Sequence, residues 1–279
     1  RCKPRSSPPN PPRGGGGEVF FPNPTPQPPP VEHLDLVAYS FNPQVHAFDN
    51  SSLVETVAAQ PETAASAHQF CGDRPLYLGP VTLRPRFNPA ATGPEIAPDP
   101  DQLPPQVDVR QMSLFGAGWT LGSIKYLAES GDVASVTYYE TSGWCGVMEK
   151  PAGSPLPDQF QSFADSVFPL YHVLADVGEF ADGQVLAARS SQPLQVDGLV
   201  LEKAGRRRAI LANLSDTPQS VRLADLGAQV RLRVLDETTA EWAMQEPEPF
   251  RATGEVLVTD AGSLTLDLNP FAVVTIDVL

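Results

Sequence analysis

Strand-like and helix-like segments alternate along the middle of this chain, and this alternation limits its possible folds more than any other feature. A short continuous apolar run at 34–41 is typical of a buried parallel strand, and a polar loop follows it. A helical pattern then covers 52–70, with capping-box spacing at Ser52 and a kink expected near Pro61. Strands that alternate with helices predict a parallel sheet.

The same order continues to about residue 180. Residues 76–83 form a second predicted strand, and a long loop follows at 84–105. Residues 110–130 predict a mostly buried helix with small residues for close contact, and 133–139 is a third strand rich in β-branched and aromatic residues. One more helix is predicted at 167–180.

The pattern changes near Gly183, where about seven short strand-like runs begin, separated by turn residues. Residues 181–279 are therefore predicted to form an antiparallel β-sandwich. The opposite end, residues 1–30, is rich in proline and glycine and shows no apolar periodicity, so we expect it to be mostly irregular. The predicted domains are this segment, an α/β part at 31–180 and the β-sandwich.

Three strand–helix units cannot close a parallel barrel, because a (β/α)8 barrel takes about eight strands and about 250 residues. The fold class that we expect is therefore α/β plus all-β, with the last strands and helices of a (β/α)8 barrel ahead of the sandwich. On this interpretation the chain is a truncated form whose other strands lie upstream. A small three-layer α/β domain, complete in itself, is an alternative that the spacing leaves open.

Charge and cysteine content exclude several classes of partner. The chain has 19 Lys and Arg against 33 Asp and Glu, a net charge of −14, so a nucleic acid backbone would be repelled. It has no apolar run of about 18 residues, so we expect no membrane span. The three cysteines are widely spaced without a CxxC pair, which predicts neither a metal site nor a disulfide framework and favours a cytoplasmic setting. No cofactor is expected.

In a (β/α)8 enzyme the functional residues follow the carboxyl ends of the strands. The first predicted strand ends near Tyr39, and Asn42, His46 and Asp49 follow it. His46 is a candidate catalytic residue, and Tyr39, Asn42 and Asp49 are candidate substrate-binding residues. A histidine with a carboxylate nearby can act as a general base that activates water, the acid holding its tautomer. The alternative is a loop histidine that only satisfies local backbone groups.

The second strand is followed by Arg84, Arg86 and Asn88. Arginines two residues apart on an extended segment point the same way, so both can bind one carboxylate or a developing oxyanion. The alternative is a pair of surface arginines that bridge acidic loops.

The third strand is followed directly by Glu140 and then by Trp144. A carboxylate in this position suits a general base or a nucleophile, and an indole can stack on a sugar ring. A buried glutamate paired with an arginine for structural reasons is the alternative. Glycosidase chemistry would need a second carboxylate at about 5–10 Å.

Core packing does not explain two stretches, VTLRPRFNP at 81–89 and TYYETSGW at 137–144. They are the most specific of several stretches that resemble the D-apionate lactonase family. Further matching stretches lie at 29–50, 52–70, 111–131 and 167–180. The resemblance covers most of 29–180, and 181–279 is similar to the C-terminal β domain of the family. It implies a glycosidase-like barrel and the hydrolysis of a sugar-acid lactone.

The leading functional hypothesis is hydrolysis of a sugar lactone such as D-apionolactone, the substrate being what the resemblance implies. Water activated by His46 or Glu140 would attack the ring carbonyl, while Arg84 or Arg86 stabilises the oxyanion. One alternative is a glycoside hydrolase that uses Glu140. Another is a non-catalytic fragment whose β domain binds carbohydrate. An incomplete barrel would leave apolar faces uncovered, so self-association is also expected.

Overall fold

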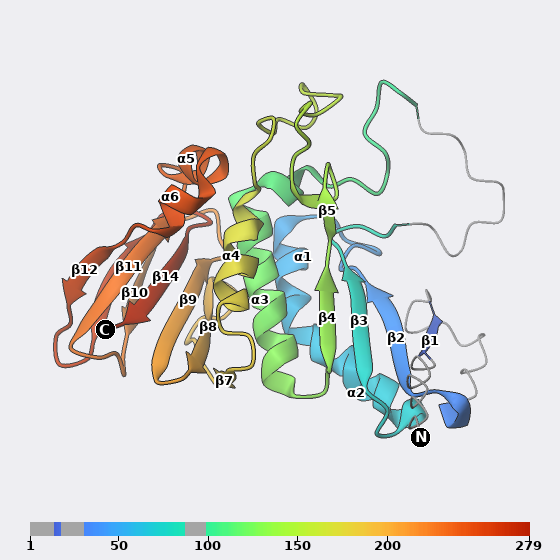
Figure 1. The fold of residues 1–279 in the computed structure, drawn as a ribbon, viewed down its shortest axis with the longest axis horizontal. Helices are drawn as coiled ribbons and strands as arrows, with labels where there is room; N and C mark the ends of the chain where they lie inside the picture. The colour runs from blue at the N-terminus through green and yellow to red at the C-terminus, as the bar shows by residue number, and fades with distance from the viewer. Residues whose placement is uncertain (1–13, 18–30, 87–98) are drawn as a thin grey trace, which may run out of the picture.

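The computed structural model describes residues 14–17, 31–86 and 99–279 of the chain. Figure 1 shows a parallel sheet with its helices at one end of the molecule and an antiparallel β domain at the other. Within these described ranges, no helix has the length and apolar character needed to cross a bilayer.

Four parallel strands form an open sheet in the order β1-β2-β3-β4. Their buried side chains, such as Leu76 and Leu78, share one core with the helices, whereas Tyr77 between them is exposed on the other face. Alternation along a strand explains this division. The strands are β1 Gly14–Gly17, β2 Leu36–Phe41, β3 Leu76–Val81 and β4 Ser135–Tyr138.

Strand β1 lies inside the segment that we expected to be mostly irregular. It pairs with β2 from Gly14, opposite Leu36, to Gly17, opposite Tyr39. Four glycines carry no side-chain pattern, so periodicity cannot reveal such a strand, although its backbone can still hydrogen-bond to a neighbour. The other residues of 1–30 lie outside the described ranges.

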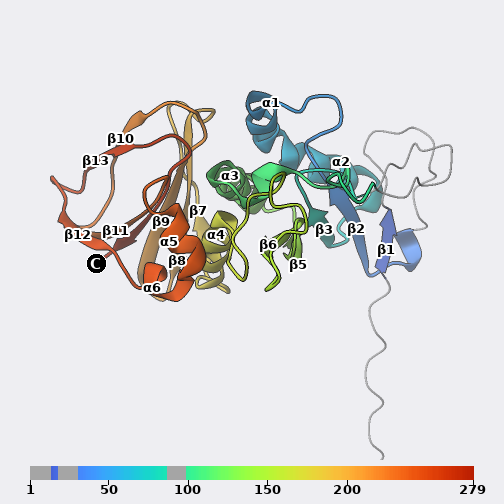
Figure 2. The same cartoon turned by 90° about the horizontal axis from the view of Figure 1, so that it is seen from above.

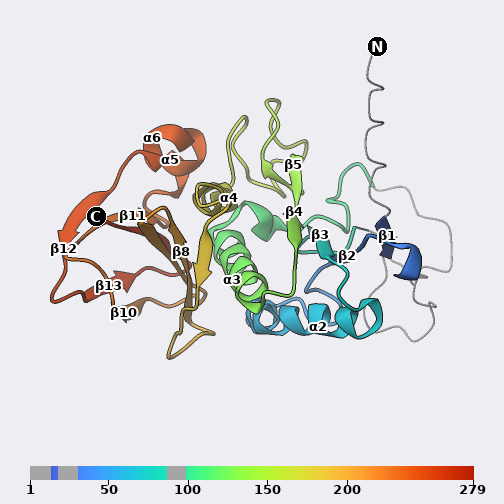
Figure 3. The same cartoon turned by 60° about the horizontal axis from the view of Figure 1, so that its bottom comes forward.

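Helices cover one face of this sheet, and Figures 2 and 3 show α2 and α3 side by side there. The predicted helix at 52–70 is present and is interrupted before Pro61, as expected. The helices are η1 Val31–His33, α1 Asn50–Glu55, η2 Val57–Ala59, α2 Gln60–Cys71, η3 Val109–Met112, α3 Leu114–Ser130 and α4 Pro169–Gly178.

The capping box predicted at Ser52 is wrong. Helix α1 starts earlier, with Asp49 as its N-cap, and the Asp49 carboxylate accepts a hydrogen bond from the backbone N–H of Ser52 at 2.9 Å. A carboxylate is a strong acceptor for the free N–H groups of a first turn, so Asp49 takes the capping position.

Helix α3 lies between the parallel sheet and the β domain, as Figure 2 shows. Its small residues permit close approach on two sides, which confirms the sequence prediction. A Cβ on Gly118 would lie 3.2 Å from Leu214 of the β domain, and one on Gly122 would lie 3.0 Å from Val57. Gly131 ends the helix in the left-handed conformation, with φ of 73°.

The β domain has a six-stranded antiparallel sheet in the order β12-β11-β14-β9-β8-β7, packed against the two-stranded sheet β10–β13. One face of the larger sheet, including Leu199 and Ile210, belongs to the core shared with the helices; the other, including Leu211 and Val274, faces β10 and β13. The strands are β7 Gln184–Leu186, β8 Val196–Lys203, β9 Arg206–Asn213, β10 Gln219–Leu223, β11 Gln229–Leu235, β12 Glu255–Val258, β13 Leu264–Leu268 and β14 Val273–Val278.

The seven predicted strand-like runs of this domain all contain strands, but three elements escaped prediction. Strand β10 has no long apolar run, and it forms because Val221 and Leu223 pack on the inner face while its backbone pairs with β13. The helices α5 Ala240–Gln245 and α6 Pro247–Arg251 are too short for a clear helical period.

A buried cluster of charges joins the two parts of the chain. Asp176 of α4 is only 2% exposed, and its carboxylate receives hydrogen bonds from Arg233 at 2.5 Å and Arg251 at 2.6 Å. Arg208 lies 3.6 Å from the same carboxylate and 2.7 Å from Glu179. These arginines come from the β domain, so the cluster fixes α4 against it. The nearby guanidinium groups outweigh burial and lower the pKa of Asp176.

Candidate functional site

The carboxyl ends of β2, β3 and β4 lie together at one edge of the parallel sheet, at the top in Figure 1. Every residue that the sequence suggested for chemistry belongs to one of the strands β2–β4 or follows its end. The structure brings some of these residues into contact and separates others.

Arg86 and Glu140 form the central pair of this edge. The Arg86 Nη2 atom lies 3.4 Å from Glu140 Oε1, and it also donates a hydrogen bond to the carbonyl oxygen of Cys145 at 3.5 Å. The Arg86 side chain is 22% exposed and that of Glu140 is 57% exposed, so the carboxylate is open to solvent beside a more sheltered guanidinium.

The backbone at the end of β4 explains why Glu140 is exposed. Tyr139 has φ of 55°, which interrupts the strand before the short pair β5 Glu140–Ser142 and β6 Gly146–Met148. The Tyr139 hydroxyl is buried and hydrogen-bonds to Thr120 of α3 at 2.7 Å. The predicted single strand 133–139 therefore ends in a turn that places Tyr139 in the core and Glu140 outside it.

Arg84 and Arg86 do not converge on one group, contrary to the prediction from their spacing. The segment after β3 bends at Leu83, Arg84 and Arg86 and is not a strand, so alternation does not apply to it. Arg84 Nε instead donates to Asp108 at 3.4 Å, and its Nη1 donates to the carbonyl oxygen of Pro105 at 3.5 Å.

Asp108 is the centre of a buried network that sequence reasoning missed. Its carboxylate accepts hydrogen bonds from Gln44 at 2.6 Å and from Arg110 Nη2 at 2.7 Å and Nε at 2.9 Å. These contacts outweigh the effect of burial and lower the pKa of Asp108 from 3.8 to about 2. Gln44, which is 2% exposed, also donates to the carbonyl oxygen of Leu83 at 2.6 Å.

The three residues proposed after β2 have different surroundings. His46 is exposed, and no hydrogen bond or ion pair joins it to another described residue. Asp49 caps α1 and accepts from the Ser52 hydroxyl at 2.8 Å, so it does not orient His46 as expected. The Oδ1 atom of Asn42 is buried and has no hydrogen-bond partner within the described ranges. The substrate-binding role of Asn42 and the catalytic role of His46 remain predictions.

Two further candidate site residues, Tyr39 and Trp144, have side chains that are fixed by contacts with other residues. Tyr39 points toward the helices, where its hydroxyl lies 2.9 Å from Thr63 of α2, so it is not at the strand ends as predicted. Trp144 is partly buried; its indole N–H donates to Ser154 at 2.9 Å, and its ring lies 6.4 Å from that of Phe160. Asn88 lies outside the described residues.

Two other kinds of chemistry were considered for this edge, a thiol nucleophile and a metal site. Burial raises the pKa of the Cys145 thiol, which keeps it protonated near neutral pH. Among the residues described, no group of three or more His, Cys, Asp and Glu side chains could hold a metal ion.

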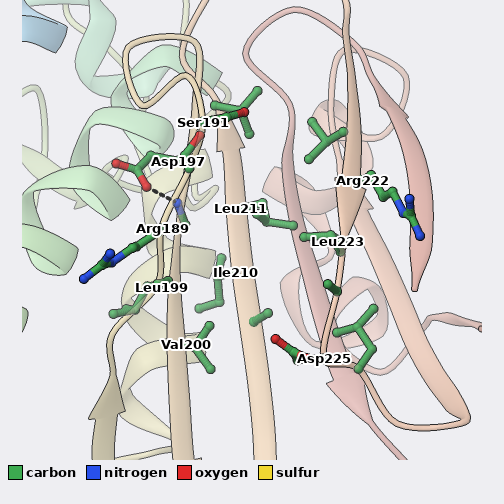
Figure 4. Close-up of a pocket in the computed structure, with 18 of the residues that line it drawn as sticks. Arg189, Ser191, Asp197, Leu199, Val200, Ile210, Leu211, Arg222, Leu223 and Asp225 are labelled. Carbon is green, nitrogen blue, oxygen red and sulfur yellow. Dashed lines mark hydrogen bonds between the residues drawn. The ribbon is translucent and has the colours of Figure 1, made fainter. Parts of the chain in front are cut away.

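A groove of about 620 Å³ lies in the β domain, away from the strand ends (Figure 4). Its floor is apolar and includes Val200 and Leu211, and it runs between β8, β9 and β10. In Figure 4 the Arg189 and Arg222 side chains point away from it. Its lining contains no residue of the Arg86–Glu140 pair or of the Asp108 network.

Family comparisons agree with this architecture along most of the chain. The D-apionate lactonase TIM barrel domain matches residues 3–182, and the D-apionate lactonase C-terminal immunoglobulin-like domain matches residues 193–276. The chain belongs to the D-apionate lactonase family. For this family member, the expected barrel-type α/β part and antiparallel β domain are confirmed.

A curated relative, D-apionate lactonase of Brucella anthropi, is 27% identical to this lactonase-family chain over 212 residues. The match covers 76% of the chain and 33% of the relative. The chain therefore spans about a third of the length of the curated relative that it matches.

Solved structures with a similar fold include two arabinofuranosidases. The α-L-arabinofuranosidase of Thermotoga maritima is 12% identical with a TM-score of 0.58, over 89% of this chain and 53% of that one. The GH51 arabinofuranosidase of Xanthomonas axonopodis pv. citri is 12% identical with a TM-score of 0.57, over 90% and 54%. At such identities the likeness shows the fold of the lactonase-family chain alone.

Proposed function

We propose that this chain takes part in the hydrolysis of a sugar-derived lactone, with D-apionolactone as substrate and D-apionate as product. The observation that carries the proposal is the Arg86–Glu140 pair, with 3.4 Å between Nη2 and Oε1, at the ends of adjacent parallel strands. Family membership supports the substrate class. The pair supplies a base and a cationic hydrogen-bond donor side by side, which is what acyl transfer to water requires.

In the proposed reaction, the Glu140 carboxylate takes a proton from a water molecule whose oxygen attacks the carbonyl carbon of the lactone. The carbonyl oxygen gains negative charge, and the Arg86 guanidinium donates a hydrogen bond to it. The bond between the carbonyl carbon and the ring oxygen then breaks. The ring oxygen takes back the proton from Glu140 and becomes a hydroxyl group of the same molecule, so the product is a sugar acid whose carboxyl group loses its proton to solvent. His46 is the alternative base.

We include Arg86 and not Arg84 as the oxyanion donor. Arg84 is already directed toward Asp108 and the Pro105 carbonyl oxygen, whereas Arg86 lies beside the exposed Glu140. Arg86 can also bind the carboxylate of the product with its fork of N–H groups. The partly buried Trp144 ring is the proposed contact for the apolar face of the sugar.

Strands beyond the four described ones are proposed to complete the site. β1 and β4 are the two edges of an open sheet, while a closed parallel barrel takes about eight strands. The relative from Brucella anthropi is about three times as long as the match. We therefore propose that a form with further barrel strands is more active than residues 1–279 alone.

The test is acid release from D-apionolactone, followed with a pH indicator, with the Brucella anthropi enzyme as the positive control. The chain is assayed alone and joined to the upstream strands of a family barrel. Glu140→Gln is expected to lower kcat/KM by about 100-fold in the active form. Glu202→Gln removes a matched exposed carboxylate, 2.9 Å from Arg207 in the β domain, and is expected to have no effect.

Three results would count against the proposal. If neither form of the chain releases acid while the relative does, the lactonase assignment is wrong. Equal activity of Glu140→Gln and the parent would remove Glu140 as the base and leave His46. Release of nitrophenol from aryl glycosides with no lactone hydrolysis would favour the glycoside hydrolase alternative.

A further inference from the structure

Arg110 uses every hydrogen-bond donor that its side chain has. A guanidinium carries five N–H groups, and Arg110 directs them to five acceptors. The acceptors are Asp108 Oδ1 at 2.9 Å, Asp108 Oδ2 at 2.7 Å, Gln44 Oε1 at 3.0 Å, the Phe48 carbonyl oxygen at 2.9 Å and Asn50 Oδ1 at 2.9 Å. Because all five N–H groups have acceptors, the Arg110 side chain has a single defined position.

The backbone of Arg110 is also fixed in place. Its carbonyl oxygen accepts a hydrogen bond from the Ser113 hydroxyl at 2.8 Å, at the start of α3. A Cβ on Gly116 would lie only 2.4 Å from that oxygen, so the turn packs directly on the helix. The guanidinium carbon lies 5.6 Å from the ring centroid of Phe115, which is buried.

Three of these contacts reach residues 42–50, which are the loop after β2 and the first residue of α1. Arg110 donates hydrogen bonds to Gln44, Phe48 and Asn50. In the sequence, His46 lies between Gln44 and Phe48. Gln44 in turn donates to the carbonyl oxygen of Leu83, just after β3. Arg110 thus connects the loop 42–50 to helix α3 and, through Gln44, to the end of the next strand.

We propose that Arg110 is a positioning residue of the lactone site, which holds the loop 42–50 in place and thereby sets the positions of Asn42 and His46. This inference rests on the proposed lactonase function. The loop lacks regular structure over 42–48, so side-chain contacts must fix it. Lysine cannot replace Arg110, because an ammonium has three donors and no planar fork.

The kinetic test compares Arg110→Lys with Arg207→Lys, a matched change at an exposed arginine of the β domain. If Arg110 positions the loop, Arg110→Lys lowers kcat by about 10-fold or more, because small misplacements of reacting groups are costly. KM changes less than kcat, and Arg207→Lys matches the parent. If Arg110 contributes only its positive charge, Arg110→Lys retains full kcat, and the proposal is wrong.

Amide hydrogen exchange on the full chain tests the same idea without activity. Arg110→Lys is expected to speed exchange of the amides at 44–50 by at least about 10-fold, because their fixed contacts are lost. The strands of the β domain keep their protection, and Arg207→Lys leaves 44–50 unchanged. Equal exchange in Arg110→Lys and the parent overturns the proposal. If no lactone is hydrolysed but exchange rises as expected, the loop-holding role stands and the lactonase function fails.

Discussion

Arg86 and Glu140 follow different strands, and their side chains meet with 3.4 Å between Nη2 and Oε1. Parallel register makes this possible, because β3 and β4 pair directly up to Val81 and Tyr138 and so end at the same edge. Arg84, only two residues from Arg86, bonds to Asp108 instead. Neighbouring arginines of the same motif therefore have different partners and different expected roles.

This difference predicts unequal effects of the same substitution. Arg86→Lys is expected to lower kcat/KM for lactone hydrolysis by about 100-fold, because a lysine cannot reproduce the paired N–H groups directed at an oxyanion. Arg84→Lys keeps a positive charge near Asp108 and is expected to change kcat/KM far less. Both are measured with the acid-release assay. A larger loss in Arg84→Lys than in Arg86→Lys would reverse the assignment.

Periodicity was sufficient to predict the main elements of the fold. The apolar runs of β2 and β3 and the buried helix α3 appear near their predicted bounds, because burial on a helix-covered face dictates their composition. The glycine strand β1 and the short helices α5 and α6 were missed. In those elements, backbone pairing or tertiary packing determines the structure and leaves no pattern in the side chains.

The site was predictable only in part, for a similar reason. The predicted strand ends indicated Arg86 and Glu140 as site residues, and their side chains are in contact in the structure. Asp108, Gln44 and Arg110 come from loops and a short 3₁₀ turn, where no period assigns neighbours. Asp49 looked like a partner for His46, but the free N–H groups of α1 compete for its carboxylate. Such competition between local and long-range partners is visible only in three dimensions.

The charge cluster around Asp176 predicts a large stability effect. Asp176→Asn removes the carboxylate that pairs with Arg233 and Arg251, and Arg251 keeps only Glu179 as an anionic partner. We expect the free energy of unfolding to fall by about 3 kcal/mol, as when one member of a buried ion pair is removed. Urea unfolding followed by circular dichroism measures it. Glu202→Gln, at an exposed pair, should change stability by about 0.5 kcal/mol or less.

Within the described ranges, the face of the parallel sheet opposite the helices is partly exposed, which predicts self-association of the isolated chain. Tyr77 on β3 is 42% exposed on the face opposite the helices. We expect the weight-average mass in sedimentation equilibrium to rise with concentration, and Tyr77→Ser to reduce the rise. Leu194→Ser removes a side chain of similar exposure in the β domain and serves as the control. A monomer at all concentrations would contradict this expectation.

His172 predicts how stability depends on pH at the interface between the two parts of the chain. Burial, reinforced by Arg233 and Arg251, lowers its pKa from 6.5 to about 4, while its Nε2 lies 2.9 Å from the Ala243 carbonyl oxygen. Between pH 6.5 and 4 the unfolded chain binds a proton at this residue that the folded chain does not. Its contribution is therefore fully present above pH 6.5 and declines as the pH falls toward 4.

A pKa of about 4 in the folded chain against 6.5 in the unfolded chain corresponds to about 3 kcal/mol. His172→Gln retains a donor for Ala243 but cannot titrate, so unfolding in urea should lose much of its pH dependence between pH 4 and 6.5. His68→Gln is the control, because hydrogen bonds to the carbonyl oxygens of Gly72 and Asp132 raise the pKa of the partly exposed His68 above 6.5, so its slope has the opposite sign and lies above the pH range measured. An unchanged slope in His172→Gln would show that other groups account for the pH dependence.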